Sequence, residues 1–97
     1  MIEARLKLIP IRSDAFCVRD IGDETILFGE EGNEIHCLDE VGSFLWESID
    51  GNRSIEELVR CVTADYEVTP EVAEQDVVRF ITELAEKGVV SLQTRAR

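Results

Sequence analysis

Three short stretches in the first half of the chain have the residue pattern of β-strands. Residues 15–21 place Phe16 and Val18 on one face of an extended segment, because successive side chains of a strand point to opposite faces. Residues 24–28 are rich in Thr, Ile, Leu and Phe, which favour strands, and residues 34–38 form the third stretch. Short glycine-containing turns separate the stretches, so we expect an antiparallel meander.

The second half of the chain predicts three consecutive helices, each with its own start signal. The first begins near Asp39, a residue type that caps helix N-termini well, and the second opens with the capping-box pattern of Ser54 and Glu57. The third opens with Thr69-Pro70, a cap followed by a proline in the first turn, and stops at Lys87-Gly88. Each helix carries apolar residues at helical spacing, which indicates one buried face.

A three-stranded antiparallel sheet packed on three helices is an α+β arrangement, and this order of elements is typical of a winged helix-turn-helix module. We expect a single domain over residues 15–92, with a last short strand at residues 89–92. Residues 1–14, interrupted by Pro10, are expected to form a partly extended lead-in segment, and residues 93–97 a polar tail.

The charge balance argues against nucleic acid, the usual ligand of such a module. The 97 residues include 10 Lys and Arg against 21 Asp and Glu, which gives a net charge of −11. A duplex would repel this chain, because nucleic-acid affinity comes largely from cationic side chains that release counterions. The third helix, residues 70–87, carries five acidic and two basic residues and is therefore a poor recognition helix. We expect no nucleic-acid partner.

The sequence also lacks the signals of a membrane or secreted protein. No apolar run approaches the roughly 20 residues that span a bilayer, and the first residues do not form a secretory signal. An anionic membrane surface would repel an acidic chain. We expect a cytoplasmic protein with no membrane partner.

No residue pattern predicts catalysis, a metal site or a cofactor. The single histidine, His36, has no nucleophile-and-base pattern around it. Cys17, Cys37 and Cys61 are odd in number and form no CxxC pair, which argues against a disulfide framework or a zinc site. We expect a reduced protein that is not an enzyme and carries no cofactor.

The expected fold offers a different kind of binding site at a sheet edge. Unpaired backbone N–H and C=O groups at an edge can accept an extended peptide as an added strand, while neighbouring pockets provide selectivity. A groove forms if the third strand is an edge and the third helix packs beside it. Alternation along the strand leaves open which of its faces meets the peptide, and core packing is an alternative explanation for the apolar residues. The expected groove walls are Ile35, Cys37, Val77, Phe80, Ile81 and Leu84.

Several motifs together resemble the PqqD family, the small proteins of pyrroloquinoline quinone biosynthesis and their relatives. Residues 38–51 (LDEVGSFLWESIDG) are similar to the family's L-N-x-x-(G/A)-x-x-I-W-x-L-L-D-G core. Residues 53–58 (RSIEEL) resemble its R-T-V-E-E-I step, and residues 84–90 (LAEKGVV) its L-x-x-x-G-(L/V)-(V/I) ending. The resemblance covers residues 15–92, with Asp39 where the family usually has Asn; either residue caps a helix.

The resemblance implies a recognition domain for the precursors of ribosomally synthesised, post-translationally modified peptides. In this family, the leader of the precursor adds as a strand beside the third sheet strand and lies against the third helix. The domain then presents the peptide to a modifying enzyme, in the namesake a radical S-adenosylmethionine enzyme. By position, the resemblance implies a peptide site at Glu34, Ile35, His36, Cys37, Leu38, Val77, Phe80, Ile81 and Leu84.

The leading hypothesis is therefore a non-catalytic peptide-binding chaperone that captures a leader by strand addition. Two alternatives stay open at this stage: a winged-helix transcription regulator, which the charge disfavours, and an acidic scaffold or regulatory subunit of an enzyme. The sequence does not identify the precursor, the modifying enzyme or the pathway. Open strand edges are compatible with either a monomer or a dimer.

Overall fold

The computed structural model describes residues 5–22, 24–29 and 34–94. Parts of the expected lead-in segment, of the two strand-connecting turns and of the tail lie outside the described residues, namely 1–4, 23, 30–33 and 95–97.

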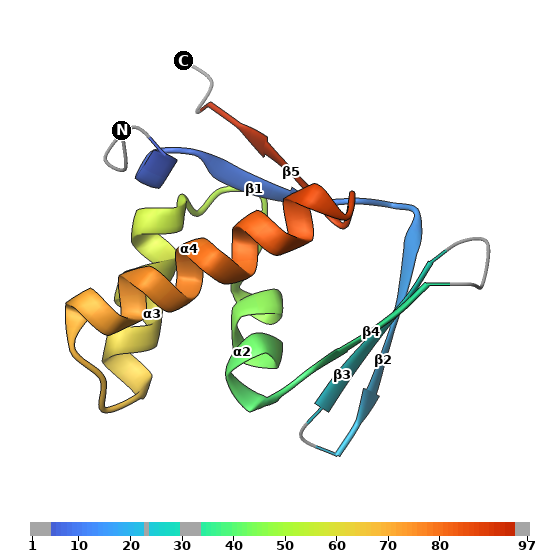
Figure 1. Cartoon of the computed structure of the whole chain (residues 1–97), viewed down its shortest axis with the longest axis horizontal. Helices are drawn as coiled ribbons and strands as arrows, with labels where there is room; N and C mark the ends of the chain where they lie inside the picture. Colours follow the sequence, from blue (N-terminus) through green and yellow to red (C-terminus); the bar gives the residue numbers. More distant parts are fainter. Residues whose placement is uncertain (1–4, 23, 30–33, 95–97) are drawn as a thin grey trace.

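The three expected strands form one antiparallel sheet. β2 (Phe16–Ile21), β3 (Glu24–Gly29) and β4 (Ile35–Leu38) lie in the order β2-β3-β4, so β3 is central and β4 is an outer strand. The predicted meander is confirmed, and Figure 1 shows this sheet standing apart from α3 and α4, with α2 between them.

The three helices begin at the predicted caps. α2 (Glu40–Ser48) follows Asp39, whose carboxylate accepts a hydrogen bond from the Gly42 backbone N–H at 2.8 Å. α3 (Ile55–Asp65) begins with the capping box, in which the side chains of Ser54 and Glu57 each accept from the other residue's backbone N–H. α4 (Pro70–Glu86) follows a threonine cap and ends before a glycine with a φ of 77°. These caps satisfy backbone N–H groups that have no partner inside the helix.

A second, two-stranded sheet contains part of the expected lead-in segment. β1 (Ile9–Arg12) pairs antiparallel with β5 (Val90–Gln93), and Ile9 is buried. The guanidinium of Arg12 donates a hydrogen bond to the Trp46 carbonyl oxygen and lies 4.6 Å from the centre of the Trp46 ring. The packed part of the chain therefore begins before residue 15, while the predicted last strand is confirmed within one residue.

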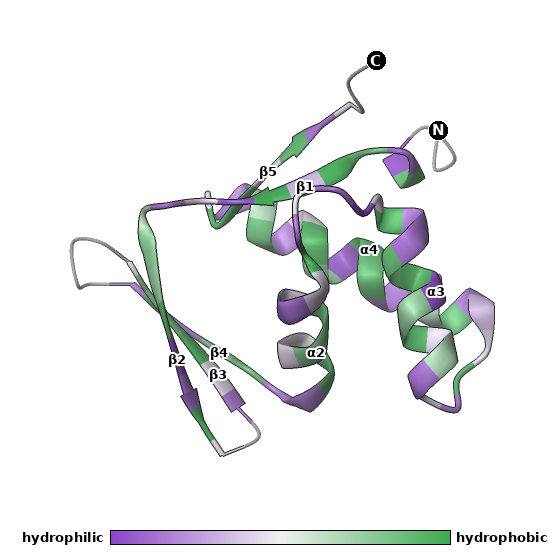
Figure 2. Ribbon diagram, turned by 180° about the vertical axis from the view of Figure 1, so that it is seen from behind, coloured by the Kyte–Doolittle hydropathy of each residue, from purple (hydrophilic) through white to green (hydrophobic). Residues whose placement is uncertain are grey.

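The hydrophobic core lies between the three helices and the inner face of the β2–β3–β4 sheet. Leu27 of β3 is fully buried, as are Leu45 of α2 and Leu58 of α3. Full burial of such a side chain contributes about 1.5–3 kcal/mol of stability. Figure 2 shows that each helix carries both hydrophobic and hydrophilic positions, as one-sided burial requires. Within the described part of the chain, none of the helices combines the length and the apolar character needed to cross a membrane.

Candidate functional site

The outer edge of β4 presents backbone groups for pairing. The Gly29 backbone N–H donates to the Glu34 carbonyl oxygen at 2.8 Å, so this pair is a hydrogen-bonded pair of the β3–β4 ladder. Hydrogen-bonded and non-hydrogen-bonded pairs alternate along an antiparallel ladder. The register pairs Phe28 with Ile35 and Ile26 with Cys37. The N–H and C=O groups of Ile35 and Cys37 therefore point away from β3, toward the open edge.

The register also shows which side chains of β4 point toward the helices and which point outward, a question that the sequence left open. Residues directly opposite each other on an antiparallel pair share a face. Leu38 lies opposite the buried Thr25, and His36 opposite the buried Leu27, so both point toward the helices. Ile35, 60% exposed, and the exposed Cys37 belong to the outer face.

A groove with a volume of about 430 Å³ lies between β4 and the C-terminal half of α4. Six of the nine predicted site residues line it: Ile35, His36, Cys37, Leu38, Phe80 and Leu84. Residues of both the strand and the helix therefore face one groove. Whether a peptide occupies this groove stays a prediction.

The other three predicted site residues do not line the groove. Val77 and Ile81 of α4 are fully buried in the core, so their expected role as groove walls is wrong. They belong to the stripe of α4 that faces the other helices, whereas Phe80 and Leu84 lie at the border of that stripe. Glu34 is exposed just before β4 and contacts His36, with 3.4 Å between its Oε1 and the His36 Nε2.

Sequence reasoning missed four residues of the groove lining: Asp39, Gly42, Glu83 and Lys87. Two of them could have been found, because Glu83 and Lys87 follow Phe80 at helical spacing and so share its side of α4. Gly42 had no such signal. A Cβ at this position would lie 3.3 Å from Cε1 of Phe80, so the glycine allows α2 and α4 to approach at the groove floor.

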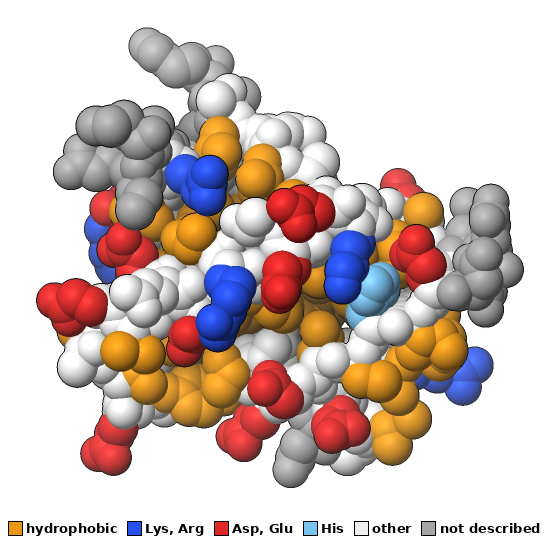
Figure 3. Space-filling view, viewed as in Figure 1, with side chains coloured by type: hydrophobic (Ala, Val, Ile, Leu, Met, Phe, Trp, Pro, Cys, Tyr) orange, Lys and Arg blue, Asp and Glu red, His pale blue; other side chains and the backbone are white. Residues whose placement is uncertain are grey.

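His36 helps to form the inner wall of the groove. Its ring lies 5.8 Å from the ring of Phe16 on β2, and its side chain is only 17% exposed. Figure 3 shows the pale blue histidine side chain at the surface between α4 and the sheet. The groove therefore combines backbone hydrogen-bonding groups at one side with aromatic and aliphatic surface at the other.

Three charged residues, Asp39, Glu83 and Lys87, are part of the groove lining, and more charged side chains lie nearby. Asp76 and Arg79 form an ion pair on α4, with 3.2 Å between Arg79 Nη2 and Asp76 Oδ1. The pKa of Tyr66 is raised by desolvation and then by the negative charges of Glu40, Asp65 and Asp39. Asp39, Glu40 and Asp65 thus place negative charges around the Tyr66 hydroxyl.

The arrangement of the groove suits the binding of an extended chain. Among the described residues, no three His, Cys, Asp or Glu side chains come together as a metal ion would require. Cys17 and Cys37 are free and exposed, and Cys61 is free and half-buried. The groove can offer hydrogen bonds to an extended backbone and apolar contacts to its side chains, which are the requirements for strand addition.

The chain matches the family described as "Coenzyme PQQ synthesis protein D (PqqD)" over residues 24–90. It belongs to the PqqD family. Among solved structures, it is similar to "TbiB1 in Complex with the TbiA(beta) Leader Peptide", with 31% identity and a TM-score of 0.76 over 84% of this chain and 94% of that one. A structure named "Lasso peptide synthetase B1 complexed with the leader peptide" shares the fold, with 20% identity, a TM-score of 0.75 and coverage of 84% and 95%. None of the curated proteins matches the chain.

Proposed function

We propose that this protein binds the leader segment of a ribosomally made precursor peptide by adding it as a strand to the edge of β4. The observation that carries this function is the open edge, with the backbone groups of Ile35 and Cys37 directed outward beside a groove lined by Phe80 and Leu84. Main-chain hydrogen bonds would hold leaders of varied sequence, and the groove would select particular side chains. Both structural relatives are named as complexes with leader peptides, which supports the proposal.

The protein then acts as a peptide chaperone with no catalytic step of its own. It holds the leader while a separate enzyme modifies the remainder of the precursor, and a radical S-adenosylmethionine enzyme is the partner suggested by the resemblance to the namesake family. A pull-down of that enzyme with and without precursor tests this second step. If the enzyme is retained on this protein only when the precursor is present, the result supports presentation of the peptide. If the enzyme is retained equally without the precursor, the protein acts as a scaffold.

Two cysteines on the outer strands provide a direct test of leader binding. Cys37 lies on β4 in the groove lining and Cys17 on β2, and both are exposed. The probes are the TbiA(beta) leader peptide and the leader of any precursor encoded beside this gene. Because only the free protein reacts, alkylation of Cys37 should slow by roughly tenfold at a peptide concentration of ten times the dissociation constant.

Alkylation of Cys17 should keep its rate, and mass spectrometry of the labelled peptides separates the two sites. An NMR titration should show amide shifts at residues 34–38 and along α4. If neither leader slows the reaction of Cys37 or shifts these amides, the proposed function is wrong.

A further inference from the structure

The groove along β4 continues into a second depression between α2 and α4. This depression has a volume of about 280 Å³ and shares Asp39, Gly42, Phe80 and Glu83 with the groove. β4 ends at Leu38 and the chain then turns into α2. A peptide that extends past this point no longer meets a strand edge, so side chains alone determine what binds in the second depression.

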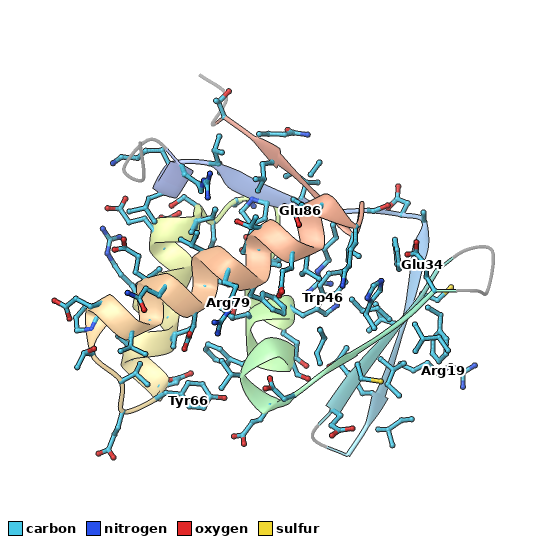
Figure 4. All side chains as sticks on the ribbon, in the orientation of Figure 1. Arg19, Glu34, Trp46, Tyr66, Arg79 and Glu86 are labelled. Atoms are coloured by element: carbon cyan, nitrogen blue, oxygen red, sulfur yellow. The ribbon has the colours of Figure 1, made fainter. Side chains whose placement is uncertain are left out.

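The second depression has an apolar floor and an acidic border. Val41, Leu45 and Phe80 supply the apolar surface, whereas Asp39, Asp76 and Glu83 supply three carboxylates. The single base in its lining is Arg79, whose guanidinium is already paired with Asp76. Figure 4 shows Arg79 on the side of α4 that lies toward α2.

We propose that the second depression binds a lysine or arginine side chain of the leader, an inference that rests on the leader-binding function proposed above. Long basic side chains have an apolar stem and a charged end, and they commonly lie along apolar surface with the charge at the border. The stem fits the surface of Val41 and Phe80, and the charged end fits between the carboxylates of Asp39 and Glu83. A leader with an acidic residue at this position is rejected by like charge.

The direction of strand addition determines where the basic residue lies in the leader. The second depression follows the C-terminal end of β4. In an antiparallel pairing, the basic residue therefore lies N-terminal to the strand-forming segment of the leader, and in a parallel pairing it lies C-terminal to that segment. Scanning both flanks of the segment identifies the basic position and the direction together.

The test uses the TbiA(beta) leader peptide with Lys, Gln or Glu placed in turn at the two positions on each side of the segment that shields Cys37. Fluorescence anisotropy measures the dissociation constants. At one flank, the peptide with Lys should bind about threefold to tenfold more tightly than the peptide with Gln. The reason is that each of two exposed ion pairs can raise the affinity by at most about fivefold. Glu should bind more weakly than Gln, and the differences should shrink in 0.5 M NaCl.

Variants of the protein assign the preference to the carboxylates. Glu83→Gln and Asp39→Asn each remove one charge, and Asn keeps the cap of α2. Each should reduce the preference for Lys by about twofold to fivefold. Glu86→Gln is the matched control, because Glu86 is an exposed acid of the same helix that lines neither depression and lies toward the β1–β5 sheet in Figure 4.

The outcomes separate this inference from the function on which it rests. If Lys, Gln and Glu peptides bind alike at every scanned position, or if Glu83→Gln and Asp39→Asn leave the preference unchanged, the inference is overturned while leader binding stands. If no peptide binds and Cys37 stays fully reactive, leader binding itself fails and this inference fails with it.

Discussion

The two outer strands of the three-stranded sheet have the same backbone chemistry in different surroundings. The alternation that directs the N–H groups of Ile35 and Cys37 outward on β4 also directs those of Phe16, Val18 and Asp20 outward on β2. Both edges could therefore accept an added strand. The groove and the second depression are lined by β4, α2 and α4 and by no residue of β2.

The difference shows what turns a strand edge into a binding site. Backbone pairing alone has no sequence preference, and an edge without side-chain pockets is chiefly a risk of aggregation. If β4 binds a leader, its selectivity would come from the groove between the strand and α4, which leaves room for side chains beside Phe80. β2 therefore serves as an internal control for experiments on β4, since it is the other outer strand of the same sheet.

Proline substitution at the two edges should produce the largest contrast. Cys37→Pro removes an outward N–H and places a ring at the edge, while the bonds between β3 and β4 are kept. We expect leader affinity to fall by more than about tenfold, because a lost hydrogen bond costs about 1 kcal/mol and the ring adds a steric clash. Isothermal titration calorimetry measures the change.

Val18→Pro is the control for this prediction, because it removes an outward N–H from β2 in the same way. Leader affinity should stay within about twofold of the unmodified protein. Thermal unfolding of both variants verifies that the sheet is intact. Equal losses of affinity at the two strands would show that the leader does not distinguish β4 from β2.

Side-chain truncation at the same two edges should give a smaller contrast. Ile35 and Ile21 are exposed to the same extent, 60% and 61%, on opposite outer strands of the sheet. Ile35→Ser should weaken leader binding by about threefold to fivefold, because part of an isoleucine side chain loses its contact with the peptide. Ile21→Ser should leave affinity unchanged. Both should change the free energy of unfolding by no more than about 0.5 kcal/mol, since the side chains are exposed.

For both variants, competition binding at several temperatures measures the leader affinity, and urea unfolding measures the free energy of unfolding. A loss of affinity in Ile21→Ser as large as that in Ile35→Ser would place the bound peptide at β2 or across the outer face of the sheet. A fall in stability confined to Ile35→Ser would instead indicate a structural role for that side chain.

Local signals in the sequence were sufficient for most of the fold. The caps at Asp39, Ser54 and Thr69 are short-range patterns, and the structure places a helix start at each. The pairing of β1 with β5 was not predicted, because it joins segments about eighty residues apart and β1 contains Pro10, a residue that disfavours strands. The register places Pro10 at a position that points away from β5, so its missing N–H breaks no bond of the ladder.

The candidate site was predictable only in part, because only some of the apolar residues of α4 line the groove and the others are buried in the core. Phe80 and Ile81 are adjacent in sequence, yet the former lines the groove and the latter is fully buried. Hydrophobicity does not distinguish a core residue from a groove residue; the rotation of the helix about its axis does. That rotation is set by tertiary packing, which includes the close approach at Gly42.

The smallest effect on binding is expected from a change in the two-stranded sheet. Arg12→Ala removes the hydrogen bond to the Trp46 carbonyl oxygen and the contact with the indole ring. The free energy of unfolding should fall by about 1–2 kcal/mol, since a charged hydrogen bond and a cation–π contact are lost together. Arg60→Ala, which removes an exposed pair with Glu56 at 3.6 Å, should cost no more than about 0.5 kcal/mol and serves as the control.

Leader affinity should be unchanged in Arg12→Ala, because Arg12 lines neither the groove nor the second depression. Urea unfolding and calorimetry on the same preparation compare the two quantities directly. If affinity fell together with stability, the β1–β5 sheet would be helping to shape the groove through Trp46 and α2. Unchanged affinity in a destabilised protein would instead confine the determinants of binding to β4, α2 and α4, so that the edge of β4 and its two depressions act as one local site.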